Sequence, residues 1–117
     1  MDSFDKYMDR RYVSGTYTCY HFAAEVWKDL TSIDLSSEIH EIFKSVHLSK
    51  EHVKRFHILA TPISPCLVVM QRGRTVPHIG VYKDGGILHI HGHGVEYQNV
   101  PTATRGFPYV RYFTCKS

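Results

Sequence analysis

The chain has 117 residues, of which 43% are hydrophobic, and a formal net charge of +3. This length and composition fit a single domain over residues 1–117 with a core of its own, and they exclude a wholly disordered chain. Because the basic residues are dispersed and no apolar run reaches the roughly 20 residues of a membrane-spanning helix, we expect neither nucleic-acid binding nor a membrane span.

A helix is predicted over residues 19–31, directly after a Ser-Gly-Thr loop. Thr18 stands where an N-cap is expected, because its hydroxyl can accept a hydrogen bond from the first turn. Five apolar residues follow with the 3.6-residue period of a buried helix face: Phe22, Ala23, Val26, Trp27 and Leu30.

Two further helices are predicted in the middle of the chain. The serines at 36–37 can cap the first of them. Its apolar face would consist of Ile39, Ile42, Phe43 and Val46. A short helix is expected from Ser49, with Val53 and Phe56 directed inward, before the prolines of 61–65 end the helical pattern.

The second half of the chain has the pattern of strands. The apolar run 66–70 predicts a buried strand, and 109–113 predicts a closing strand. Residues 78–83 and 86–91 are predicted to pair as a hairpin, because Asp84-Gly85 between them is a strong two-residue turn signal. We therefore expect an α+β fold in which N-terminal helices pack on an antiparallel sheet of four to six strands.

Cys19 is the cysteine best placed for chemistry. A helix N-terminus stabilises a thiolate, so we expect Cys19 to be the one thiol with a low pKa. Its position on the apolar stripe also fits an inert core residue. Cys66 and Cys115 form no Cys-x-x-Cys pair with it, which predicts neither a zinc knuckle nor a disulfide framework and favours a reducing compartment.

The predicted hairpin brings histidines together. With 84–85 as the turn, His91 lies opposite His78, and His89 lies opposite Gly80. His78 and His89 are then diagonal neighbours with no side chain between them, so one imidazole can hydrogen-bond the other. A side chain at position 80 would raise strand propensity but fill that space. Cysteine catalysis requires a base beside the thiol and a polar group that fixes the tautomer of the base.

Two other interpretations of the histidines stay open. They could be exposed residues on a sheet face with no functional role. Alternation along one strand also fits metal ligation by His89, His91 and His93. Gly92 and Gly94 favour a loop in that stretch, and Glu96 would fall on the opposite face of a continued strand. We expect no metal and no other cofactor.

Several segments together resemble a known family. They are Tyr17–Phe22 leading into Trp27, Pro65–Met70, His78–Tyr82 with Gly86–His89 after it, and Tyr109–Phe113. They are similar to the NlpC/P60 superfamily of papain-like cysteine peptidases, most closely its small phage-tail-type members. The third segment resembles the H-[VI]-G-[VI]-Y strand of that family and the F-[VI]-H strand after it. The resemblance covers nearly the whole chain except about 31–60.

The resemblance implies a papain-like fold and a set of site residues. Cys19 would be the nucleophile, His78 the general base and acid, and His89 the polar residue that orients His78. The backbone N–H of Cys19 would contribute to an oxyanion hole. Tyr12 best matches the family's substrate-contacting tyrosine, with Tyr7 as a rival.

The resemblance also implies a function, which is hydrolysis of peptidoglycan stem peptides by a cysteine amidase. Departures at Thr18, Tyr20 and His21 affect the substrate pocket rather than the triad, and His21 is expected at the pocket rim. Without a visible signal peptide we expect a protein that is cytoplasmic as made, then delivered to the periplasm or cell wall. A phage tail, a secretion machine or an immunity protein would be its partner. The alternatives are a non-catalytic structural protein on the same fold, or acyl transfer or protein cleavage by the same triad.

Overall fold

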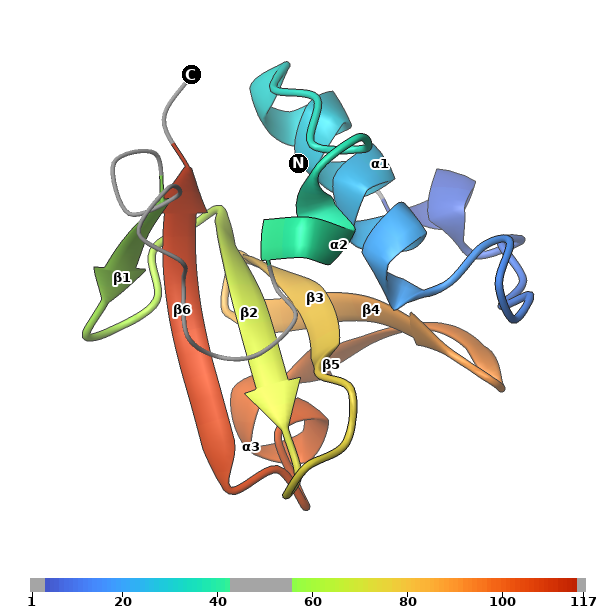
Figure 1. The fold of residues 1–117 in the computed structure, drawn as a ribbon. Helices are drawn as coiled ribbons and strands as arrows, with labels where there is room; N and C mark the ends of the chain where they lie inside the picture. Colours follow the sequence, from blue (N-terminus) through green and yellow to red (C-terminus); the bar gives the residue numbers. More distant parts are fainter. Residues whose placement is uncertain (1–3, 43–55, 116–117) are drawn as a thin grey trace.

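The computed structural model describes residues 4–42 and 56–115, which form one six-stranded antiparallel sheet with helices beside it (Figure 1). The strands are β1 (Phe56–Leu59), β2 (Cys66–Gln71), β3 (His78–Lys83), β4 (Gly86–His91), β5 (Gly94–Asn99) and β6 (Tyr109–Cys115), in the spatial order β1-β6-β2-β3-β4-β5. The helical segments are the 3-10 turn η1 (Asp5–Tyr7), α1 (Cys19–Thr31), α2 (Ile39–Ile42) and α3 (Val100–Ala103). The predicted α+β class and antiparallel sheet are confirmed.

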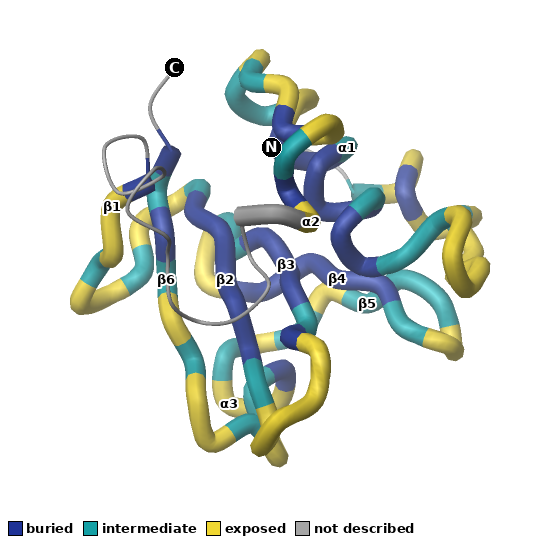
Figure 2. Tube along the Cα trace, viewed as in Figure 1, coloured by how far each residue is buried: buried dark blue, intermediate teal, exposed yellow. Residues whose placement is uncertain are grey.

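Helix α1 packs on one face of the sheet and α3 lies near the other. The stripe of Phe22, Val26 and Trp27 is fully buried and belongs to the same cluster as Ile79 of β3 and Leu88 of β4. On the opposite face a smaller cluster joins inner-strand residues to α3: Val68, Met70, Ile87 and Ala103. Because β2, β3 and β4 are covered on both faces, they are buried along most of their length, whereas the edge strands β1 and β5 are only partly buried (Figure 2).

The elements that carry the predicted site lie where the sequence places them. The helix over 19–31 is α1, and Thr18 before it is extended, as an N-cap should be. Strands β3 and β4 have the predicted bounds, and Lys83 pairs with Gly86 across the turn. Asp84 and Gly85 have φ values of 52° and 91°, which is the left-handed conformation that a type I′ hairpin turn requires at both positions.

The side chain of Phe56 is directed inward as predicted, being 1% exposed, but Phe56 is not helical. It begins β1 and pairs with Cys115 of β6, instead of closing a helix, because the end of β6 offers it a backbone ladder that no local pattern reveals. Of the predicted second helix, the described part is α2. The rest of that helix and the residues from Ser49 to Val53 lie outside the described residues.

Strand β5 and helix α3 are not predicted by the sequence pattern. Strand β5 has mixed polarity because it is an edge strand, partly exposed along its length. The cap of α3 is a missed signal: Asn99 Oδ1 accepts a hydrogen bond from the Thr102 N–H at 2.9 Å, and a proline lies in the first turn. In the part of the chain that the structure describes, no helix has both the length and the apolarity needed to cross a bilayer.

Candidate active site

A pocket of about 650 Å³ lies where the start of α1 meets the start of β3 and the end of β4. Three of the four predicted site residues line it, namely Cys19, His78 and Tyr12. The fourth, His89, is buried behind His78 and hydrogen-bonded to it. The fold therefore gathers residues from the N-terminal segment, α1 and the β3–β4 hairpin around one cavity.

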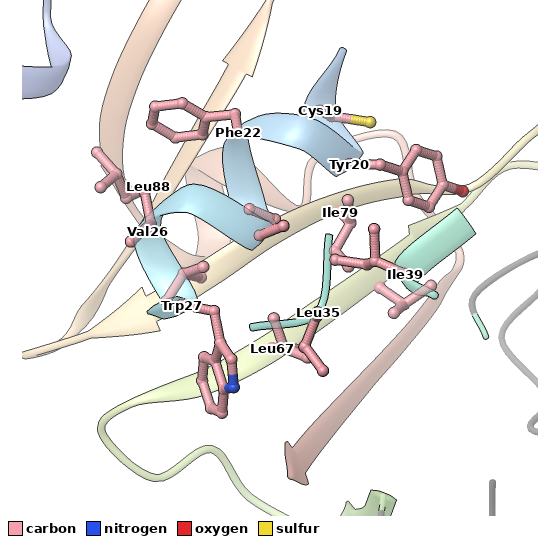
Figure 3. Close-up of a cluster of buried hydrophobic side chains, with 14 of the residues drawn as sticks. Cys19, Tyr20, Phe22, Val26, Trp27, Leu35, Ile39, Leu67, Ile79 and Leu88 are labelled. Atoms are coloured by element: carbon pink, nitrogen blue, oxygen red, sulfur yellow. The ribbon is translucent and has the colours of Figure 1, made fainter. Parts of the chain in front are cut away.

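Cys19 is the first residue of α1, and the helix start fixes its place. The Thr18 backbone N–H donates to Nδ1 of His21 at 2.9 Å, a side-chain cap that holds the first turn. Figure 3 shows Cys19 at the end of the apolar stripe, with its sulfur directed away from Phe22. Only 6% of Cys19 is exposed, so it belongs to the core cluster and lines the pocket at once.

The expected low pKa of Cys19 is not found. Burial raises the pKa of this thiol, and the facing backbone N–H groups of Ile79, Tyr20 and Cys19 itself offset that rise only in part. The rise in the thiol pKa from desolvation thus outweighs the lowering expected from the helix N-terminus. Cys19 is a neutral thiol at neutral pH, and any nucleophilic role requires a neighbouring base to take its proton.

His78 and His89 form the predicted diagonal pair. Nε2 of His78 lies 2.8 Å from Nδ1 of His89, and the ring centroids are 5.0 Å apart in an edge-to-face arrangement. The pairing of β3 with β4 follows the predicted register from Lys83–Gly86 to Val81–Leu88. On its other side, His78 stacks on Phe107 with the rings 6.0 Å apart and 12° from parallel. The imidazole ring of His78 is thus held from two directions.

The environment keeps His78 uncharged. Burial is the main cause that lowers its pKa, to about 4, and the neighbouring His89 and His91 add to the effect. Burial also lowers the pKa of His89. Both rings are therefore neutral at neutral pH.

Gln98 of β5 is a neighbour of this pair that sequence reasoning missed. Its Oε1 lies 2.7 Å from Nε2 of His89, diagonal across the β4–β5 ladder. Its contact with His89 depends on the pairing of β5 with β4, for which the Gly-His-Gly stretch of 92–94 before alternating residues is a hairpin signal.

The same turn corrects the expectation for Glu96. The chain reverses at Gly92 and His93, so Glu96 lies directly opposite His89 and on the same face, with its Oε1 3.0 Å from Nε2 of His91. His93 lies in the exposed turn. Among residues 4–42 and 56–115, no three His, Cys, Asp or Glu side chains are placed to hold a metal ion.

The two candidate tyrosines occupy different places. Tyr12 is 40% exposed at the pocket, whereas Tyr7 is buried and its hydroxyl donates to Asp29 of α1 at 2.6 Å. The segment between them is fixed to α1 by an ion pair of Arg10 with Glu25 at 2.8 Å. These contacts favour Tyr12 over Tyr7 as a residue that a pocket ligand would meet.

The remaining pocket wall is formed by aromatic and imidazole rings. His21 lies at the pocket, as expected for a rim residue, and its ring is 4.8 Å from that of His40 of α2. Tyr20 donates its hydroxyl to the Pro77 carbonyl at 3.0 Å and so ties α1 to the segment before β3. The sequence does not indicate His40 as a site residue, because no sequence pattern relates α2 to the pocket.

Comparisons of the chain with protein-family models, with curated proteins and with solved structures found no match. The chemistry available to the site depends on the geometry of its residues. That geometry offers a buried thiol, a neutral imidazole at the same cavity, and a hydrogen-bonded second imidazole behind it.

The substitution Gly80→Ala tests how closely β3 and β4 pack beside His89. A Cβ there would lie 2.8 Å from Ile87 Cγ2 and 3.1 Å from His89 Cβ, so the substitution overpacks the strands rather than stabilising them. We expect Gly80→Ala to lower the free energy of unfolding by about 1–3 kcal/mol in urea titrations. Gly92→Ala is the control, since no atom lies within 4 Å of its Cβ. Equal stability of the two variants would contradict the close packing at His89.

The low pKa of His78 predicts acid sensitivity. In the folded state His78 protonates only near pH 4, whereas in the unfolded chain it protonates near its ordinary pKa of 6.5, so the unfolded state gains the proton first. Stability contributed by neutral His78 is present above pH 6.5 and is lost as the pH falls toward 4. We expect wild type to lose about 2 kcal/mol more than His78→Gln between pH 7 and pH 5, measured by urea unfolding. Parallel pH profiles for the two proteins would refute this.

Proposed function

We propose that this chain is a cysteine hydrolase that cleaves amide bonds through an acyl-enzyme on Cys19. The observation that carries the proposal is the 2.8 Å hydrogen bond between His78 and His89, beside a pocket that Cys19 and His78 both line. A neutral imidazole held by a second polar group next to a thiol is the arrangement of nucleophilic cysteine catalysis.

The reaction follows from these states of charge. His78 takes the proton of the Cys19 thiol as the sulfur attacks the substrate carbonyl carbon, and a tetrahedral oxyanion forms. His78 then gives that proton to the departing amine, which leaves a thioester on Cys19. Water attacks the thioester while His78 again accepts and returns a proton, so the carboxylate product and the free thiol are released. The backbone N–H of Cys19, at the start of α1, is suited to donate to the oxyanion.

For the substrate we propose peptidoglycan stem peptides. Support comes from the resemblance of short segments, such as His78–Tyr82, to NlpC/P60 motifs and from a net charge of +3, which suits an anionic polymer. The pocket of about 650 Å³ with Tyr12 at its edge is large enough for a short peptide. Delivery by a phage tail or a secretion machine, and control by an immunity protein, belong to the same proposal.

One observation favours a second candidate, a non-catalytic structural role. Cys19 is 94% buried from solvent, being only 6% exposed, and belongs to the cluster of Phe22 and Val26, so its sulfur also fills space in the core. In that case the histidine pair would serve packing alone. The two candidates differ in whether removal of the sulfur changes chemistry or only stability.

Digestion of purified peptidoglycan, followed by mass spectrometry of the soluble fragments, tests the proposed function. We expect wild type to release stem-peptide fragments and Cys19→Ala to release none, because among the described residues no other thiol lines the pocket. Cys115→Ala is the matched control, since Cys115 is similarly buried at 7% exposure but is far along the chain in β6. Equal release by wild type and Cys19→Ala, or fragments cut outside the peptide, would overturn the assignment.

A second test separates the neighbouring histidines. His89 contacts His78 directly, whereas His91 pairs with Glu96, so we expect His89→Ala to lower kcat roughly 100-fold or more and His91→Ala to have a mild effect. His89→Gln should keep part of the activity, because an amide can still accept from His78. Turnover of one stem-peptide substrate by the three variants measures this. A crippling His91→Ala beside a mild His89→Ala would show that the orienting residue is misassigned.

A further inference from the structure

The hydrogen bond between His78 and His89 does not by itself fix the direction in which it is donated. Either ring could be the donor across the 2.8 Å between His78 Nε2 and His89 Nδ1. The direction matters because it decides which nitrogen of His78 is free. If His78 donates through Nε2, its Nδ1 carries a lone pair and is a base. If His89 donates instead, the proton of His78 lies on Nδ1, and that ring cannot accept the thiol proton.

The contacts around His78 position the ring without choosing between these states. Phe107 stacks on its face, and Gly80 leaves space for His89. Neither offers a hydrogen-bond acceptor or donor in the plane of the ring. His91 lies 5.6 Å from His89 between ring centroids and is paired with Glu96, so it does not complete the network of His89.

Gln98 is the one directional contact of this network among the described residues. Its Oε1 lies 2.7 Å from Nε2 of His89, and an amide oxygen only accepts hydrogen bonds. With its amide oxygen facing the ring, Gln98 pairs with the Nε2–H tautomer of His89, which leaves Nδ1 as an acceptor. The Nε2–H of His78 donates to that acceptor, and Nδ1 of His78 becomes the free base.

We infer that Gln98 is a positioning residue that sets the tautomers of both histidines and thereby makes His78 a base; its effect on turnover rests on the proposed function. No proton passes along the hydrogen bonds from His78 through His89 to Gln98, since the thiol proton stops at Nδ1 of His78. An amide also adds no charge, in contrast to a carboxylate at this place. It therefore leaves both buried histidines neutral, in keeping with the pKa of about 4 at His78.

Nitrogen NMR of the histidine side chains tests this directly, because the shifts of protonated and unprotonated ring nitrogens differ. At neutral pH we expect wild type to show His78 and His89 as Nε2–H tautomers. Gln98→Ala should populate the Nδ1–H form of both rings, because the acceptor that fixed the direction is gone. Gln71→Ala is the matched control. It also removes a glutamine whose side chain makes one hydrogen bond, to the Thr75 carbonyl at 2.9 Å, and it should keep the wild-type tautomers.

Gln98→Glu gives a readout that a purely structural role would not move. The carboxylate still accepts from His89, so the tautomers should stay as in wild type. Its charge should raise the pKa values of both histidines, so their NMR titrations and the acidic limb of kcat/KM should move to higher pH. In Gln98→Ala, kcat should fall roughly tenfold or more with KM unchanged, because part of the protein holds His78 in the wrong tautomer.

The outcomes separate the two proposals. Wild-type tautomers in Gln98→Ala, or an Nδ1–H His89 in wild type, would overturn the role of Gln98 whatever the activity. The expected spectra in a protein that cleaves no stem peptide would support the role of Gln98 and overturn the proposed hydrolase.

Discussion

The packing of α1 on the sheet is the contact on which the site depends. Phe22, Val26 and Trp27 are fully buried against β3 and β4, and the strip of helix that they anchor ends at Cys19. The same burial that places the sulfur at the pocket also removes water from it, and this raises the pKa of the thiol. The packing of α1 thus determines both the position and the protonation state of the Cys19 thiol.

The burial of the site also determines the charge states of Cys19 and His78. A thiolate stabilised by an ion pair would need a charged partner, but burial makes both Cys19 and His78 neutral. In the proposed reaction, such a neutral pair requires His78 to be held in the tautomer that can accept the thiol proton, because it has no charge to attract that proton beforehand. The contacts from His78 through His89 to Gln98 meet that requirement without adding a charge to the core.

The polar contacts form a diagonal line across three strands. His78 is on β3, His89 on β4 and Gln98 on β5, and each contact crosses one ladder. Buried polar groups need hydrogen-bond partners, so such a line is stable in a sheet only when every ring nitrogen facing the interior has one. Gly80 makes the first crossing possible, since a methyl group there would lie 3.1 Å from His89 Cβ.

The helix that carries Cys19 and the hairpin that carries His78 and His89 can be predicted from the sequence. The apolar period over 19–31 determines α1, and the Asp84-Gly85 turn determines the register of β3 and β4, because both signals are local and strong. From these two elements the contact of His78 with His89 follows by counting. The edge strands could not be predicted in this way: β1 depends on β6, more than 50 positions away in the case of Phe56 and Cys115, and β5 has the mixed polarity of an exposed edge.

What the sequence determined by itself is which residues share a helix face or a hairpin, because those relations have fixed periods. The tertiary structure alone decided the state of the thiol, since burial of Cys19 outweighs the field of the helix end and burial is a property of the whole packed core. It also decided that Tyr12 and His40 border the same pocket as Cys19, and that Gln98 and Glu96 face the histidine strand. These contacts join segments that only the folded structure brings together, and no local pattern in the sequence indicates them.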